Sequence, residues 1–428
     1  MAAIDYRIAS SVRVGAPGVY LEEIMPESAP VFRTGVPVFV GFVHENGSGN
    51  EGRDEEKRPC TLTHWEQFRE RVGQPVRGGF LEYVVRGFFE NGGEYCIVIP
   101  LRVPRGEPDS VWLTGEFEKL FTKDISGWRG ILEQVEDADL ICVPDVMMEG
   151  VREDPEVVFR IQRDVLEYCR DMGDRFAILD IAPIGDTERG SFTKVRVEDI
   201  EQAIQHWQEL SPTEGALYFP WIRVQPLPDE DRDGVLVPPC GHIAGIYARS
   251  DAGIGVHKAP ANEIVEGALD LEVHLTDDDQ SELNEVGVNC LRSFPRRGIR
   301  VWGARTLSAL PNWRYVNVRR LFLTLVRWIE RNMQDLVFEP NGPPLWDRVR
   351  DRLGAYCYEL FVRGALKGGQ PDEAFFVKCD AETNPLEARE AGRLICELGL
   401  APLTPAEFII VRITQVATGV TATIPAAA

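Results

Sequence analysis

Short, continuous apolar runs alternate with amphipathic stretches through the first half of this 428-residue chain. The apolar runs predict strands that are buried on both faces: 36–43, 95–101, 138–146, 175–183 and 216–224. The amphipathic stretches predict the helices between them: 79–90, 155–172 and 197–210. Such alternation indicates a mainly parallel sheet covered by helices on both faces, so the predicted fold class is α/β, with α+β character overall.

The second half contains the most strongly periodic helix. A short apolar strand at 299–304 leads through a turn at 310–312 into a helix predicted over 316–337. Its apolar residues fall on one face, and Arg320, Arg327 and Arg331 fall on the opposite face. Such a face is usually solvated, but three arginines on one stripe of an acidic chain also suggest a surface that docks carboxylates.

A second amphipathic helix is predicted over 385–398, with Asn384 as its N-cap and Pro385 in its first turn. Ala391, Leu394, Ile395 and Leu398 would form its apolar stripe, and Gly399 would end it. The charged residues would occupy the exposed side: Arg389, Arg393, Glu390 and Glu397. A plain solvated face remains an equally good interpretation of this side.

The two ends of the chain differ from its middle. Residues 1–30 show strand-like alternation interrupted by glycine and proline, and they are too short to bury both faces. They are either a flexible leader or a strand added to another sheet, including one on another subunit. A closing strand is predicted over 408–416, and the small residues of 418–428 are expected to be frayed.

Composition narrows the classes of function. The net charge of −22 disfavours nucleic acid as a partner, since phosphate binding needs a basic surface. The nine cysteines are scattered without a CxxC pair, which is typical of reduced core cysteines in a cytosolic protein. No apolar run approaches the roughly 18 residues of a membrane span, and no signal peptide is evident, so direct membrane insertion is not expected.

The sequence motifs predict no catalytic, cofactor-binding or metal-binding residue. Residues 229–234 match the first half of a calcium-binding EF-hand loop, but position 12 falls on Cys240, and a solvated acidic linker is the better interpretation. No GxGxxG or GxxxxGK[ST] follows the first strand, which disfavours a nucleotide site. The histidines form no metal-ligand pair such as HExxH.

Several segments together resemble the contractile tail sheath proteins of phage tails, type VI secretion systems and extracellular injection particles. They occur in the family's order: APGVYLEEI (16–24), TGVPVFVGF (34–42), PPCGHIAGIYARSDAGIGVHKAPAN (238–262), FPRRGIRVWGARTL (294–307), WRYVNVRRL (313–321) and NPLEAREAGRLICELGLAPLTPAEFIIVRI (384–413). One departure is Arg296, where the family's turn has glycine.

The resemblance implies a structural polymer of stacked hexameric rings around an inner tube, not an enzyme. It divides the chain into an N-terminal arm (1–30), the start of the sheath core (31–100), a variable inserted α/β domain (101–234), a C-terminal core domain (235–415) and a tail (416–428). For the N-terminal segment the resemblance implies strand addition between subunits, through Val12, Val14, Val19, Tyr20, Leu21 and Ile24. The closing strand would supply the other arm or the edge that receives it, through Phe408, Ile410, Arg412 and Ile413.

The implied partners are further copies of the chain, the inner tube protein, and baseplate and terminal cap proteins, with assembly in the bacterial cytoplasm. The tube-facing candidates are Arg389, Arg393, Glu390 and Glu397, and Arg320, Arg327 and Arg331 form a second candidate interface. Two alternatives remain: a non-contracting cap or baseplate component, and a nucleotide-dependent α/β enzyme suggested only by the strand–helix alternation.

Overall fold

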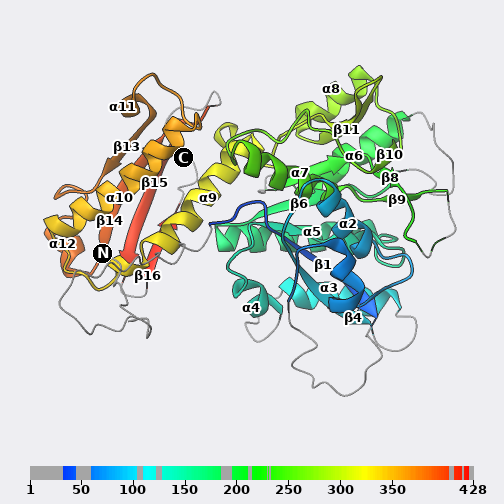
Figure 1. The fold of residues 1–428 in the computed structure, drawn as a ribbon, viewed down its shortest axis with the longest axis horizontal. Helices are drawn as coiled ribbons and strands as arrows, with labels where there is room; N and C mark the ends of the chain where they lie inside the picture. The colour runs from blue at the N-terminus through cyan, green and yellow to red at the C-terminus, as the bar shows by residue number, and fades with distance from the viewer. Residues whose placement is uncertain are drawn as a thin grey trace, which may run out of the picture. The chain divides into compact units, whose positions relative to one another are not determined.

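The computed structural model describes residues 32–44, 59–103, 109–121, 128–184, 195–210, 215–228, 230, 233–403, 409–416 and 419–423. Only the backbone is described for residues 121 and 128 and for the strands after residue 403. The chain divides into one unit of residues 1–32 and a second of residues 33–428. All the elements described below belong to the second unit (Figure 1).

A nine-stranded sheet with a parallel centre organises the first part of this unit. Its strand order is β12-β11-β7-β6-β5-β1-β4-β2, and β3 pairs with β1. Its strands are β1 (Pro37–His44), β2 (Cys60–Leu62), β3 (Gln74–Pro75), β4 (Cys96–Val103), β5 (Leu140–Cys142), β6 (Phe176–Asp180), β7 (Ala216–Phe219), β11 (Asn289–Phe294) and β12 (Gly298–Val301). The pairs from β11 through β7, β6, β5 and β1 to β4 are parallel, which confirms the predicted α/β class.

The helices of this part form two groups. The connection from β1 to β4 contains α2 (Leu81–Glu90) and crosses the sheet in one direction. The connections from β4 to β5, β6 and β7 cross it in the opposite direction, and they contain α3 (Ser110–Phe121), α4 (Trp128–Glu133), α5 (Pro155–Met172) and α6 (Val197–Leu210). Right-handed crossovers in opposite directions place their helices on opposite faces of a sheet. In agreement, α2 packs with α7 (Cys240–Gly253), whereas α5 packs with α3 and α6. A one-turn helix, α1 (Phe68–Arg71), precedes α2.

The predicted strand 216–224 is divided at Pro220. Its second half, β8 (Ile222–Val224), joins β9 (Val235–Val237) and β10 (Ala268–Leu271) in a separate antiparallel sheet. The helix α8 (Asp277–Val286) then precedes the β11–β12 hairpin. In the turn of that hairpin Arg296 has φ of 64°, a left-handed conformation that favours glycine. The departure from the family's glycine therefore keeps the glycine-like backbone.

The last part of the chain builds an antiparallel sheet beside two long helices. The helices are α9 (Val316–Asn332) and α10 (Pro343–Val362), with the short helices α11 (Pro371–Ala374) and α12 (Leu386–Glu390). The sheet has the order β13-β14-β15-β16, with β13 (Phe375–Lys378), β14 (Leu394–Leu400), β15 (Ile409–Val416) and β16 (Gly419–Thr423). Figure 1 shows α9 and α10 alongside these strands, and α9 contacts β16 while α10 contacts β13.

Two predictions about this last part are wrong. Residues 394–398 belong to β14 and not to a helix over 385–398, because α12 ends at Glu390 and Gly392 has a left-handed φ of 68°. Residues 419–423 are not frayed, since they pair with β15 as the strand β16. The predicted helix 316–337 ends at Asn332, and a 3-10 turn at Gln334–Leu336 follows it.

Two clusters of buried apolar side chains hold the unit together. The first core extends from Val36 to Leu323 and surrounds the nine-stranded sheet. The second core extends from Trp313 to Leu400 and lies between α9, α10 and the antiparallel sheet. The helix α9 contributes to both cores, with Leu323 in the first and Phe322 and Leu325 in the second. The division into domains at residues 100/101 and 234/235 stays a prediction.

Candidate functional site: the arginine face of α9

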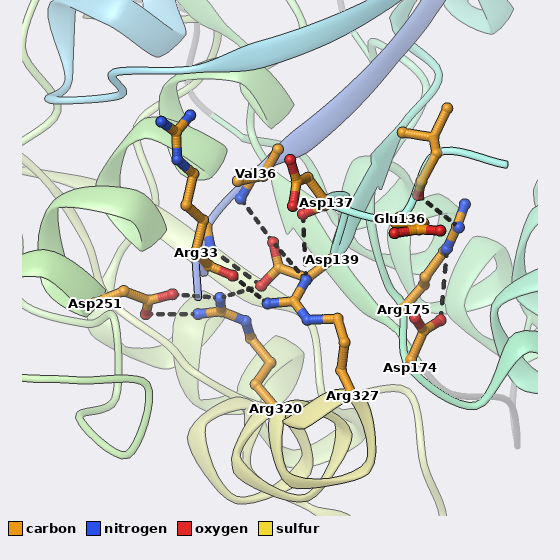
Figure 2. Close-up of polar contacts among 12 residues, drawn as sticks. Arg33, Val36, Glu136, Asp137, Asp139, Asp174, Arg175, Asp251, Arg320 and Arg327 are labelled. Atoms are coloured by element: carbon orange, nitrogen blue, oxygen red, sulfur yellow. Dashed lines mark hydrogen bonds and ion pairs between the residues drawn. The ribbon is translucent and has the colours of Figure 1, made fainter. Parts of the chain in front are cut away.

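The arginines of α9 form a ladder of polar contacts with the first core. Arg320, Arg327 and Arg331 follow one line along the helix, opposite the residues that enter the second core. Figure 2 shows Arg320 and Arg327 extending from α9 towards Asp139, Asp251 and the backbone of Arg33. The line of arginines predicted from the sequence therefore exists, and the carboxylates that it contacts belong to the same chain.

Arg320 makes the most complete set of contacts. Its Nη1 and Nη2 donate to the two carboxylate oxygens of Asp251 at 2.9 and 2.6 Å, a forked geometry that suits a planar guanidinium. Its Nη2 also donates to Asp139 Oδ2 at 3.2 Å. The ring of Tyr247 lies 4.7 Å from the guanidinium carbon, at a distance suited to a cation–π contact. The Arg320 side chain is only 3% exposed, so these groups replace its hydration.

The electrostatics of this pair follow from its burial. Burial raises the pKa of the Asp251 carboxyl, and the adjacent Arg320 guanidinium opposes that rise. Burial lowers the pKa of the Arg320 guanidinium, but Asp251 and Asp139 more than offset this effect and hold the pKa above its ordinary value. Arg320 is therefore a permanent positive charge between two carboxyl groups. Removing it would leave Asp251 buried without a counter-charge, whereas Asp139 would keep Arg327 at 3.9 Å.

The ladder fixes the short segment 33–36 through four consecutive residues. Arg327 donates to the carbonyl oxygen of Arg33, and Thr34 hydrogen-bonds to Asp251. The Asp139 carboxylate accepts from the backbone N–H groups of Gly35 and Val36 at 3.0 and 2.6 Å. This is the point where residues 1–32 join the second unit. Residues 33–36 themselves are held by charge and backbone hydrogen bonds in addition to the apolar packing of Val36.

Gly35 shows how closely this segment approaches α7. Its φ is +70°, and a Cβ atom there would lie 2.6 Å from the Cα atom of Ala248. Any side chain at this position would both strain the backbone and displace α7. Asp251, the main partner of Arg320, lies four residues nearer the C-terminal end of the same helix than Tyr247. The helix α7 therefore supports the segment sterically and supplies the carboxylate that anchors α9.

The structure corrects the prediction of an exposed arginine face. Arg320 and Arg327 are each 2% exposed, and they contact carboxylates and carbonyl groups of their own chain. Arg331 is the partly exposed member, with a side chain 28% exposed that pairs with Asp137 at 3.0 Å. A role of these arginines in contacts with other subunits or a tube stays a prediction. Because Arg320 and Arg327 are buried, Arg331 is the member of the three that another protein could reach.

The acidic partners of the ladder, Asp139, Asp251 and Asp137, were not predicted from the sequence. Asp251 lies inside the segment GIYARSDAGIG on which the resemblance rests, and Asp139 stands at the start of an apolar strand. The sequence did contain one indication: Asp139 is a carboxylate at the start of a strand predicted to be buried, and a buried carboxylate needs a partner. The partner could not be assigned, since Arg320 lies 181 residues from Asp139 and 69 from Asp251.

The four residues predicted to face a tube do not share a helix face. Arg389 and Glu390 lie in α12 and Arg393 in the turn after it, and all three are exposed. The Arg389 Nε donates to Asn341 O at 3.2 Å, and its guanidinium carbon lies 5.6 Å from the Trp346 ring. Glu397 is separate, in strand β14 opposite Lys378 and Arg412. Asn384 is not an N-cap, because its amide pairs with the backbone of Ile395 in β14.

The predicted arm residues are placed only in part. Val12, Val14, Val19, Tyr20, Leu21, Ile24 and Phe408 lie outside the described residues. Ile410, Arg412 and Ile413 lie in β15, which is an inner strand paired with β14 and β16 of its own chain. This arrangement differs from the prediction that residues 408–416 add to a neighbouring sheet or receive its strand. That role stays a prediction, and the edges of the sheet are β13 and β16.

The described residues contain no cluster of three or more His, Cys, Asp or Glu arranged to hold a metal ion. The EF-hand-like stretch falls partly outside the described residues, since positions 229, 231 and 232 are not among them. Within the described part of the chain, no helix is both long enough and apolar enough to cross a membrane.

Comparison with known proteins agrees with this architecture. The family described as the phage tail sheath protein central domain matches residues 132–307, and the phage tail sheath C-terminal domain matches residues 308–415. The tail sheath protein of Salmonella phage ViI is 23% identical over 266 residues, which cover 56% of this chain. The matched part spans only 39% of that relative.

Two solved structures resemble almost the whole chain. The sheath complex of the extracellular contractile injection system PVC, in its contracted state, is 30% identical with a TM-score of 0.65, covering 93% of this chain and 97% of that chain. A chain of the anti-feeding prophage (AFP) baseplate is 28% identical with a TM-score of 0.66, covering 92% and 97%. The chain therefore belongs to the contractile tail sheath family, whose members are structural proteins of phage tails and related injection particles.

Proposed function

We propose that this chain is the subunit of a contractile sheath, which polymerises as stacked hexameric rings around an inner tube protein and contracts to drive that tube through a target envelope. The observation that carries the proposal is its likeness, over 93% of its length, to a sheath solved in the contracted state. A heterologous contact that repeats without closing on itself generates a helical polymer of this kind.

The arrangement of the unit suits such a polymer. The antiparallel sheet of the second core has two edges, β13 and β16, and either could accept a strand from another subunit. Main-chain pairing between subunits persists while rigid bodies rotate, so arms could keep a lattice connected during contraction. The ladder on α9 supports this role, since it anchors residues 33–36 to the helix that also packs on this sheet.

A tube contact is best sought at the exposed turn around α12. Arg389, Glu390 and Arg393 are exposed there, and Leu386 beside them is 65% exposed. We propose that this turn, and not a long helix, is the tube-facing element. The proposed partners are the inner tube, baseplate and terminal cap proteins, and the proposed place of assembly is the bacterial cytoplasm.

The decisive experiment is electron microscopy of the purified full-length chain, alone and after co-expression with its tube partner. Hollow cylinders with sixfold rings are expected. Wild-type protein that stays monomeric under both conditions would overturn the proposal. Removing residues 1–24 should leave a folded subunit, judged by circular dichroism, that forms no contracting lattice. A truncated protein that still assembles and contracts would show that this segment is not an arm.

A non-contracting baseplate or cap component is the second candidate, favoured by the similarity to a chain solved within a baseplate. The same micrographs separate the two functions. A sheath subunit forms cylinders of many rings, whereas a baseplate or cap component forms single rings or caps and adds no length when more protein is supplied.

A further inference from the structure

The second core contains three buried cysteines in addition to its apolar side chains. Cys357 lies in α10, Cys396 in β14, and Cys379 directly after the edge strand β13. All three are at most 1% exposed, and all three are free thiols. None of them takes part in the arginine ladder or in the proposed tube contact.

The strand register places two of these thiols opposite each other. Strands β13 and β14 are antiparallel, and their pairing runs from Phe375 opposite Leu400 to Lys378 opposite Glu397. One further step of this register brings Cys379 opposite Cys396. Residues directly opposite in antiparallel strands have Cα atoms about 4.5–5.5 Å apart. A disulfide needs Cα atoms about 4.4–6.8 Å apart, so two cysteines in this register fall within the range.

The side chains also point towards each other. The Cys379 and Cys396 thiols share a hydrogen bond, and the amide nitrogen of Asn384 lies 3.8 Å from the Cys379 sulfur. The hydrogen bond from Cys396 lowers the pKa of Cys379 despite its burial, and the same bond raises the pKa of Cys396. Cys379 is thus the better nucleophile of the pair, and Cys396 is placed to resolve it.

We propose that Cys379 and Cys396 form a reversible disulfide when the protein meets a peroxide or a disulfide oxidant. With hydrogen peroxide, the Cys379 thiolate attacks one oxygen, the O–O bond breaks, and Cys379 becomes a sulfenic acid while hydroxide takes up a proton to leave as water. The Cys396 sulfur then attacks the sulfenic sulfur, forming the S–S bond and releasing a second water. Two thiols are oxidised, and one peroxide is reduced to two waters.

The position of Cys379 gives oxidants a route to it. It follows an edge strand and precedes the turn at 380–383, where Ala381 and Glu382 are exposed. Local opening at the end of an edge strand needs fewer broken contacts than opening in the middle of a sheet. The disulfide would pin the end of β13 to β14. If the chain is a sheath subunit, which is the function proposed above, this would stiffen one of the two edges offered to neighbouring subunits.

The test uses the purified full chain, first reduced and then exposed to hydrogen peroxide or to oxidised glutathione. Free thiols are blocked under denaturing conditions, and peptides are mapped by mass spectrometry. We expect a peptide pair joined through Cys379 and Cys396, about 2 Da lighter than the sum of its reduced peptides and separated again by dithiothreitol. Cys379 and Cys396 both recovered as blocked thiols, or joined to Cys357 instead, would overturn the proposal.

Variants give a second readout. Cys396→Ser should abolish the linked peptide, whereas the matched control Cys290→Ser, at a buried cysteine of β11 in the first core, should leave it intact. Oxidation should raise the thermal midpoint of the wild-type protein reversibly and should not raise that of Cys396→Ser. The mass measurement on wild-type protein remains decisive even if a serine variant fails to fold, and it does not depend on the proposed function.

Discussion

The first core and the second core bury different kinds of side chain, although one helix belongs to both. Around the nine-stranded sheet, carboxylates are buried among the apolar residues. In the described part of the chain, the buried carboxylates all lie between Glu82 and Glu272. Both cores contain buried cysteines, but the described residues of the second core include no buried carboxylate, and Asn384 supplies a buried amide there. Charge is therefore concentrated on the side of α9 that faces the first core.

The buried carboxylates of the first core bind ends and turns of the backbone. Asp145 accepts from the N–H groups of Phe42 and Phe80, both at 2.6 Å, beside the start of α2. Asp180 accepts from the N–H of Cys240 at 2.9 Å, at the start of α7. Carboxylates at helix N-termini satisfy backbone donors that a helix cannot pair internally. A parallel sheet with many strand–helix junctions creates such donors, whereas a four-stranded antiparallel sheet creates fewer.

The largest expected effect comes from removing the charge that joins the two cores. Arg320→Ala leaves Asp251 buried without its counter-charge, while Asp139 keeps Arg327 at 3.9 Å, and we expect a loss of about 3–5 kcal/mol in the free energy of unfolding at neutral pH. Burial raises the pKa of Asp251, and the variant lacks the guanidinium that opposes this rise, so Asp251 can take up a proton and the loss should shrink as the pH is lowered from 8 to 5. Urea unfolding at several pH values, followed by fluorescence, measures both effects.

Leu325→Ala is the matched control from the other face of α9. Leu325 is fully buried in the second core, and its truncation should cost about 2–5 kcal/mol through lost packing and a cavity. That loss has no titratable cause and should stay constant between pH 5 and pH 8. If the two variants show the same pH dependence, the contrast between a charged and an apolar face of α9 is wrong.

A smaller effect is expected from Asp180. Burial raises the pKa of its carboxyl from an ordinary 3.8 to about 7, against the opposing hydrogen bond from Cys240. At a pH between these two values, the Asp180 carboxyl is protonated in the folded chain and ionised in the unfolded chain. The contribution of Asp180 is therefore greatest at low pH and is lost as the pH rises towards 7. Asp180→Asn should remove a slope of at most about 1.4 kcal/mol per pH unit, measured by urea unfolding from pH 5 to pH 8.

Asp335→Asn provides the comparison from the last part of the chain. A hydrogen bond from Arg352 lowers the pKa of Asp335, so its contribution is complete above the ordinary carboxyl pKa and is lost only as the pH falls through its lowered value. This variant should leave the slope between pH 5 and pH 8 unchanged. If Asp180→Asn also retains the wild-type slope, the Asp180 carboxylate is not protonated in the folded state.

The sequence predicted local structure well where one periodicity was clear. The helices at 155–172 and 197–210 begin and end at the predicted residues, because each has a single apolar stripe and a defined first turn. Residues 385–398 fit two periodicities. Ala391, Leu394, Ile395 and Leu398 suit a helix, yet Leu394, Cys396, Leu398 and Leu400 also alternate, and these four are the buried apolar side chains of β14. Pairing with β13 and β15 decided between them, and pairing across a sheet is not a local property.

The sequence predicted which arginines of α9 share a face, but it did not predict which residues they contact. The line Arg320, Arg327 and Arg331 follows from helical geometry alone. Whether such a line faces solvent, another subunit or the same chain depends on which segments fold against it. Here those segments are 33–36, the strand entry at Asp139, and α7. An acidic chain offers many carboxylates, so charge complementarity could not select Asp139 and Asp251.

The smallest expected effect is that of Arg331→Ala, at the solvent end of the ladder. Arg331 and its partner Asp137 have side chains 28% and 45% exposed, and water replaces much of their mutual attraction. We expect a loss below about 1 kcal/mol, reduced further by added salt. Urea unfolding at low and high ionic strength measures it. A loss as large as that of Arg320→Ala would mean that the ladder acts as one cooperative network. A small loss would mean that the buried contacts of Arg320 stabilise the packing of α9 on the first core without help from Arg331.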